Sequence, residues 1–192
     1  MSAADPLERF AALPTRLLLD SSTLQTLLGY GEFVFENVAP PPADRARRIP
    51  GSLDDLDALR CIFQVNERAG FDIVLSENSL REVADKSDAR YTSWALDVLD
   101  HWLTRVNEYQ GRAFDGGGVK LAARLDGRSF GYLSAKDKQL LIDALVLECD
   151  AFLTMERKLA KNASQLEAAV GIKVLRPPDY WALLRPWAAL YR

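Results

Sequence analysis

Short apolar runs alternate along this chain with longer segments in which apolar residues recur at helical spacing. The runs at 16–19, 73–75, 151–153 and 172–175 have the length and composition of buried strands. Strands of a parallel sheet, buried on both faces, are typically continuous apolar runs of this kind. Their alternation with helices predicts an α/β fold with a mainly parallel central sheet.

Helical spacing predicts the elements between these runs. The expected helices lie around 24–28, from Ser52 onward, near 79–86, from about 91 to 109, at 135–148, at 157–169 and from Pro177 onward. Ser52 and Asp55 have the spacing of a helix-capping pair. The proline-rich residues 37–51 and the glycine-rich residues 111–132 are expected to be irregular loops.

The length of the chain, 192 residues, suits one domain. We expect residues 1–15 to form an N-terminal arm and residues 16–192 a single domain with inserts near 31–60 and 111–132. No apolar run approaches the roughly 18 residues that span a bilayer, and no basic region precedes an apolar one at the N-terminus. A cytoplasmic protein without a membrane partner is therefore expected.

Charge and rare reactive residues argue against several classes of protein. Lys and Arg number 24 against 27 Asp and Glu, a net charge of −3, which argues against a wholly basic nucleic-acid binder but leaves room for a local basic groove. The single histidine, His101, makes a histidine-based metal site or a Ser–His–Asp triad a poor hypothesis. Cys61 and Cys149 have apolar neighbours and are expected to be free thiols.

Carboxylates stand near the expected carboxyl ends of the strands, where open parallel sheets bind ligands. The residues concerned are Asp20, Glu82, Asp137 and Glu156. If they converge, they repel one another unless a cation neutralises them. Mg²⁺ prefers oxygen ligands and takes one or two carboxylates directly, and two such ions can clamp the attacking and leaving oxygens of a phosphoryl displacement.

The same acids lie in segments that resemble a known family. These segments are 17–24, 73–83, 137–159 and 172–177. In this order they resemble the opening strand, the second motif, the third and fourth acids and the last strand of the PIN domain. The most specific match runs from Asp137 through the strand Ala151-Phe152-Leu153-Thr154 to Glu156.

The resemblance implies a three-layer α/β/α fold and a Mg²⁺- or Mn²⁺-dependent endoribonuclease that hydrolyses single-stranded or structured RNA. It implies that the catalytic and metal-binding residues are Asp20, Glu82, Asp137 and Glu156. Ser22 and Thr154 would not bind the metal themselves but would orient the ligands or a water. A toxin of a toxin–antitoxin pair belongs to the same hypothesis, and an antitoxin partner and a homodimer stay open.

Two departures from the family keep other functions open. Glu156 stands where the family more often has aspartate, and the two inserts are longer than in compact VapC-type toxins. A PIN-like scaffold that binds RNA or protein without cleaving it is therefore an alternative, and a DNA nuclease of the same superfamily is another.

Single residues also have structural explanations. Asp137 follows Ser134 at capping spacing, so taken alone it is a helix-cap residue. Gly116–Gly118 lack the spacing of a phosphate-binding loop. The basic residues of the inserts are as consistent with loop solubility as with phosphate binding. They are Arg45, Arg47, Arg48, Lys120, Arg124 and Arg128.

Overall fold

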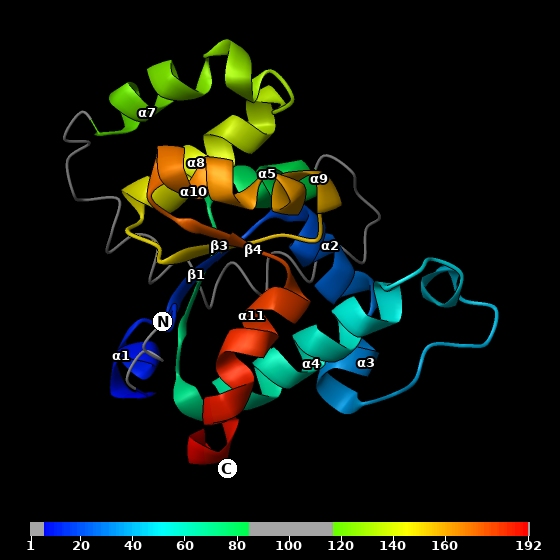
Figure 1. Ribbon diagram of the computed structural model, residues 1–192. Coiled ribbons are helices and arrows are strands. Elements are labelled where there is room, and N and C mark those ends of the chain that lie inside the picture. The colour runs from blue at the N-terminus through cyan, green and yellow to red at the C-terminus, as the bar shows by residue number, and fades with distance from the viewer. Residues whose placement is uncertain (1–5, 85–116, 192) are drawn as a thin grey trace.

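The four expected strands form one sheet in which every neighbouring pair is parallel. The computed structural model describes residues 6–84 and 117–191. The strands are β1 (Arg16–Leu19), β2 (Asp72–Val74), β3 (Ala151–Leu153) and β4 (Lys173–Leu175), in the spatial order β2-β1-β3-β4. The predicted α/β fold with a parallel sheet is confirmed (Figure 1).

Helices surround the sheet. The α-helices are α1 (Pro6–Ala11), α2 (Ser21–Gly29), α3 (Gly31–Glu36), α4 (Ser52–Ala69), α5 (Glu77–Ala84), α7 (Gly117–Leu125), α8 (Ala135–Val146), α9 (Arg157–Lys161), α10 (Ala163–Val170) and α11 (Pro177–Leu184). Short 3-10 helices lie at η1 (Arg45–Arg47), η2 (Arg128–Phe130) and η3 (Arg185–Tyr191). None of the helices within the described residues is long and apolar enough to cross a membrane.

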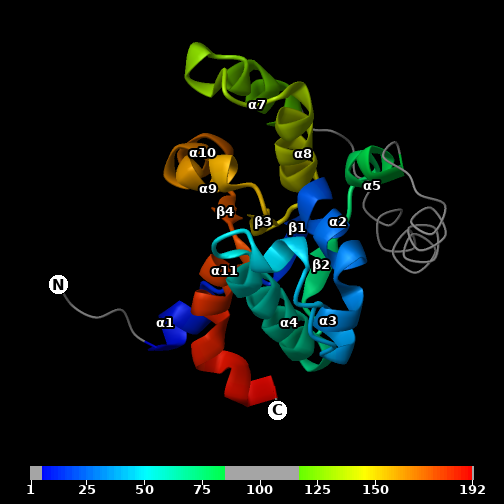
Figure 2. The ribbon, with the colours of Figure 1, turned by 90° about the vertical axis from the view of Figure 1, so that its right-hand side faces the viewer.

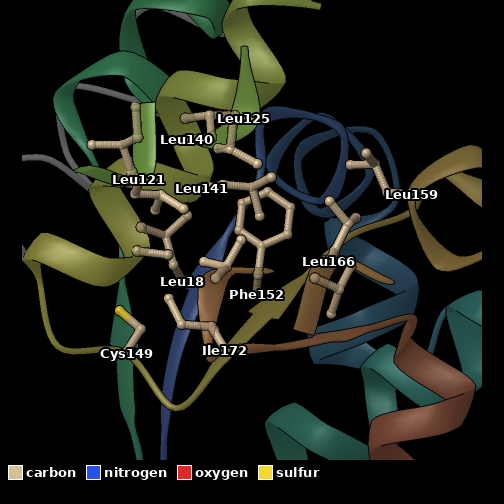
Figure 3. Close-up of a cluster of buried hydrophobic side chains, with 14 of the residues drawn as sticks. Leu18, Leu121, Leu125, Leu140, Leu141, Cys149, Phe152, Leu159, Leu166 and Ile172 are labelled. Atoms are coloured by element: carbon tan, nitrogen blue, oxygen red, sulfur yellow. The ribbon is translucent and has the colours of Figure 1, made fainter. Parts of the chain in front are cut away.

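Alternate strand residues point to two hydrophobic cores, one on each face of the sheet. Leu17 and Leu19 of β1 lie in a core with residues of α2, α3, α4 and α11. Leu18 lies between them in sequence and belongs to the opposite core, with residues of α7, α8, α9 and α10. Phe152 lies near the middle of this second core (Figure 3). The period of two in β1 thus produces the layers on both sides of the sheet seen in Figures 1 and 2.

The order of the strands identifies one edge of the sheet as a place for ligands. The chain passes from β1 outward to β2 and then returns to β3 on the other side of β1. The winding therefore reverses between β1 and β3. In open α/β sheets, ligands bind outside the carboxyl ends of the strands at such a point. Asp20 directly follows β1, and Thr154 directly follows β3.

The glycine-rich segment differs from its prediction. Residues 111–116 lie outside the described residues, and the next part of the segment is helical rather than a loop, with Gly117 and Gly118 inside α7. Leu121 and Leu125 lie one helical turn apart and are buried in the core that includes α8. Burial of this apolar pair outweighs the low helix propensity of the glycines.

Two details of the predicted helices are also wrong, although α4 begins at Ser52 as expected. Ser52 does not cap α4, because Gly51 occupies the N-cap position with φ of 75° and no side-chain hydrogen bond. The helix expected over 157–169 is broken at Asn162, whose side-chain amide donates to the Lys158 carbonyl at 2.9 Å. A side chain that bonds a backbone carbonyl competes with the helix in this way.

Other predictions have mixed outcomes. Cys61 and Cys149 are free, as expected, and burial raises the pKa of Cys149 to about 12. The arm at 1–15 contains α1, and Phe10 packs edge-on against Trp187 with the ring centroids 5.1 Å apart. The proposed helix at 91–109 and His101 lie outside the described residues.

Candidate functional site

Asp20 is the centre of the candidate site and is almost completely buried, with 3% of its surface exposed. It caps α2 by accepting a hydrogen bond from the Thr23 amide at 2.7 Å. Ser22 Oγ also donates to it at 2.8 Å, and Thr154 Oγ1 donates from the neighbouring strand. Burial raises the pKa of Asp20, and the bonds from Thr154, Thr23 and Ser22 oppose the rise. All three partners are neutral, so the charge of the carboxylate is not cancelled by them.

Thr154 joins Asp20 to Glu156. Its hydroxyl donates to Asp20 and accepts a hydrogen bond from the Glu156 amide at 3.0 Å. Ser22 Oγ makes a second link between the strand ends by accepting from the Met155 amide at 3.2 Å. Ser22 and Thr154, predicted as supporting residues, thus both contact Asp20 and fix the turn that carries Glu156.

Glu82 reaches the same edge of the sheet from α5. Its carboxylate accepts a hydrogen bond from Ser21 Oγ at 2.6 Å, and Ser21 is the residue that follows Asp20. Lys136 Nζ lies 3.9 Å from the other oxygen of Glu82. The Glu82 side chain is only 13% exposed, so these contacts hold it in a partly desolvated position.

Asp137 forms the capping box that its spacing from Ser134 predicts. The Ser134 amide donates to the Asp137 carboxylate at 2.7 Å, and the Asp137 amide donates to Ser134 Oγ at 3.1 Å. One carboxylate oxygen is therefore engaged in starting α8. The capping role leaves the negative charge of Asp137 able to act on Glu156, where it helps to raise the pKa.

The negative charges of the other acids affect Glu156. Its pKa is raised, first by burial and then by the negative charges of the other three carboxylates, with Lys158 opposing the rise. The three acids are Asp137, Asp20 and Glu82, in order of decreasing effect. Like charges raise the pKa of a carboxyl only when they are close to it. We call these four residues the acid cluster: Asp20, Glu82, Asp137 and Glu156.

The acid cluster matches a divalent metal in the type of its donors and in its charge, because carboxylate oxygens are the ligands that Mg²⁺ and Mn²⁺ prefer. Within the described ranges, however, no three acidic, His or Cys side chains are grouped so as to hold an ion. Mg²⁺ keeps several waters and needs only one or two direct carboxylates. The donor set therefore fits such an ion, although a preformed cage of three ligands is not found.

The basic residues of the inserts do not share one role. Arg47 donates to the Pro40 carbonyl at 2.8 Å, and Arg48 donates to the Ala43 carbonyl at 2.9 Å, so both brace their own loop. Arg124 donates to the Ala169 carbonyl at 2.6 Å. The remaining predicted residues, Arg45, Lys120 and Arg128, are exposed.

Among the described residues, the cations that act on the acid cluster are not those predicted. Lys136 contacts Glu82, and Lys158 acts on the pKa of Glu156. Arg157, next to Glu156, donates to the Pro50 carbonyl and so ties the end of the proline-rich loop to this edge. Adjacency in sequence to Asp137 and Glu156 was the signal that would have identified these cations.

Comparison of the chain with protein-family models, with curated proteins and with solved structures found no match.

Proposed function

We propose that this chain is a Mg²⁺- or Mn²⁺-dependent endoribonuclease with a PIN-like α/β/α fold. The observation that carries the proposal is the junction at the ends of β1 and β3. There Thr154 holds Asp20 and the turn of Glu156 together at the point where the sheet reverses its winding. The arrangement keeps carboxylates close together, which is favourable only if a cation joins them.

The roles of the chain's own residues can be derived from their contacts. Ser22 and Thr154 fix Asp20, and Ser21 fixes Glu82, so that the carboxylates are held before substrate arrives. Such preorganisation avoids the free energy of rearranging charged groups during the reaction. When bound, a divalent ion would neutralise the carboxylates and lower the pKa of the water that attacks phosphorus.

Lys136 and Lys158 lie on the rim of the acid cluster, where a polyanion has to approach. Positive charge at this rim offsets the repulsion between the carboxylates and the phosphates of RNA. The same proposal includes location in the cytoplasm, an antitoxin partner and a homodimer. The proposed cleavage chemistry does not depend on these three properties.

The test is cleavage of labelled single-stranded RNA and DNA in Mn²⁺, in Mg²⁺ and in EDTA. We expect cleavage of RNA with metal, none in EDTA, and a loss of at least about 100-fold in Asp20→Asn and Asp137→Asn, since ligand groups contribute at least as much as the groups that support them. Glu67→Gln, an exposed acid on α4, is the matched control and should cleave like the wild type.

Each outcome decides between the candidate functions. Unchanged cleavage in both Asn variants would contradict the role of the acid cluster. Cleavage of DNA alone would favour a DNA nuclease. A wild-type protein that binds many RNAs and cleaves none would favour the binding scaffold. The observation that favours this alternative is that the described residues contain no preformed group of three metal ligands.

A further inference from the structure

A small cavity opens beside the acid cluster, between α5 and α8. Its volume is about 250 Å³. It is lined by Asn78, Arg81, Glu82, Ala135, Lys136 and Gln139. Glu82 belongs both to this lining and to the acid cluster, and Lys136 is next to Asp137 in sequence. A group bound in the cavity would therefore lie directly beside the Glu82 carboxylate. Figure 2 shows α5 and α8 near α2, whose first residue directly follows Asp20.

Two side-chain amides in this lining are oriented by one carboxylate. Asn78 Nδ2 donates to Asp143 Oδ2 at 2.8 Å, and Gln139 Nε2 donates to Asp143 Oδ1 at 2.9 Å. Each of these bonds uses one N–H of the amide. A second N–H and the carbonyl oxygen remain on each amide, a donor and an acceptor side by side.

This pattern is complementary to the edge of a nucleobase. Bases also present a donor next to an acceptor, and asparagine and glutamine bind them through paired hydrogen bonds. Unpaired RNA bases are commonly read in this way on their exposed edges. The fixed orientation lowers the entropy lost when the amides bind a base.

Two cations complete the lining. Arg81 lies 3.7 Å from Glu77, and Lys136 lies 3.9 Å from Glu82, both as exposed side chains in long ion pairs. The Arg81–Glu77 pair is exposed on both sides and therefore weak, and the Lys136–Glu82 pair is long and has an exposed ammonium group, so both cations can turn to a phosphate at little cost. The cavity thus offers amides to a base and cations to the phosphate attached to it.

We infer that this cavity binds one unpaired nucleobase of the RNA strand, next to the phosphodiester that the acid cluster would act on. The inference rests on the proposed function. A volume of about 250 Å³, just below the usual range for small-molecule sites, suits a single base and not a base pair. Asp143 is then a positioning residue that acts through Asn78 and Gln139.

Binding without turnover tests this inference separately from cleavage. The full chain is titrated in EDTA with two fluorescein-labelled 12-mers, one an RNA strand and the other its abasic counterpart with the same phosphates. We expect the wild type to bind the RNA strand more tightly. Gln139→Ala and Asn78→Ala should each raise the Kd for the RNA strand about two- to tenfold, the loss of one net hydrogen bond. Their Kd for the abasic strand should not change.

Gln64→Ala, an exposed glutamine on α4, is the matched control and should bind both strands like the wild type. Circular dichroism checks that Asn78→Ala is folded, and Gln139→Ala provides an independent readout from an exposed position. Equal affinity of the wild type for both strands, no binding of either, or unchanged RNA affinity in both variants would overturn the inference.

These results remain distinct from those of the cleavage assay. Metal-dependent cleavage with unchanged binding in both variants would leave the proposed function intact and remove the base site. Base-dependent binding that the variants lose, in a protein without metal-dependent cleavage, would support the base site and reject the nuclease.

Discussion

Two aspartates at the carboxyl edge of the sheet are buried to nearly the same degree, and their surroundings differ. Asp20 at the end of β1 is 3% exposed, and Asp55 on α4 is 4% exposed. Burial is the main reason that the pKa of each is raised. Asp55 is paired with Arg176, which directly follows β4 and whose Nη2 lies 2.5 Å from both carboxylate oxygens. Asp20 has only neutral hydrogen-bond donors among the residues described, and Glu156, whose pKa its charge helps to raise, is joined to it through Thr154.

This difference distinguishes a structural carboxylate, which is paired with a cation of the chain, from a carboxylate whose charge has no such partner among the described residues. Asp55 finds its counter-charge within the chain, in Arg176. Among the described residues no cation contacts the desolvated carboxylate of Asp20, and such an arrangement is typical of functional sites. We therefore expect Asp55 to contribute mainly to folding and Asp20 mainly to binding.

The largest effect on stability is expected from Asp55→Ala. Removing one member of a buried ion pair leaves the other charge uncompensated, so the free energy of unfolding should fall by about 3 kcal/mol. Urea denaturation measures the change. The double variant Asp55→Leu/Arg176→Met removes both charges and should lie within about 1 kcal/mol of the wild type. A single variant as stable as the wild type would show that the pair does not hold α4 to the end of β4.

The sheet was largely predictable from the sequence because its strands are continuous apolar runs between helical segments. Each strand lies within one residue of its prediction, and Leu18 could be assigned to a buried strand before its core was known. The exceptions occur where a local signal was misleading. Because of Gly117 and Gly118, the segment that forms α7 was predicted to be a loop. Ser52 suggested a helix cap, but Gly51 occupies the N-cap position of α4.

The site was predictable only in part, since its contacts join residues that are far apart in sequence. Asp20, Asp137 and Glu156 could be selected because they follow strands or begin helices, whereas Glu82 lies inside α5 and was selected by the family resemblance of its segment. The bond from Ser21 to Glu82 spans 61 residues, and the pair of Asp55 with Arg176 spans 121. No local pattern predicts such partners. The cations beside the acid cluster were missed for another reason, because basic residues were chosen from the composition of the loops and not from their adjacency to Asp137 and Glu156.

A second, smaller effect is expected from divalent metal, and it should distinguish the two aspartates. At a free Mg²⁺ or Mn²⁺ concentration ten times the Kd, binding to the folded state stabilises it by about 1.4 kcal/mol. For a chain of this length the melting temperature should rise by about 3–6 °C. Asp20→Asn should lose this shift, and Glu67→Gln should keep it. Sodium chloride at equal ionic strength controls for screening, and an equal shift in Asp20→Asn would contradict metal binding at the acid cluster.

The metal effect should depend on pH in a known direction. The pKa values of Asp20 and Glu156 are raised above their ordinary 3.8 and 4.5, so the folded protein holds protons that the unfolded chain has released. Without metal, this contribution to stability is full below those ordinary values and is lost as the pH rises through the folded values. Metal requires the deprotonated carboxylates, so its stabilising shift should grow as the pH rises through the same range. A metal shift that weakens as the pH rises through this range would contradict the assignment.

The smallest effect is expected from Lys136→Ala. The Lys136 side chain is 61% exposed and lies 3.9 Å from Glu82, so the free energy of unfolding should change by less than about 0.5 kcal/mol. Removal of this positive charge should nevertheless tighten divalent metal binding about two- to fivefold, since the ion no longer competes with the ammonium group for Glu82. Lys138→Ala is the matched control, because Lys138 is two residues away on α8 and pairs with Asp126 at 2.8 Å. Equal metal affinities in the two lysine variants would mean that Glu82 does not bind the same metal ion as Asp20. The metal site would then consist only of the residues around the ends of β1 and β3.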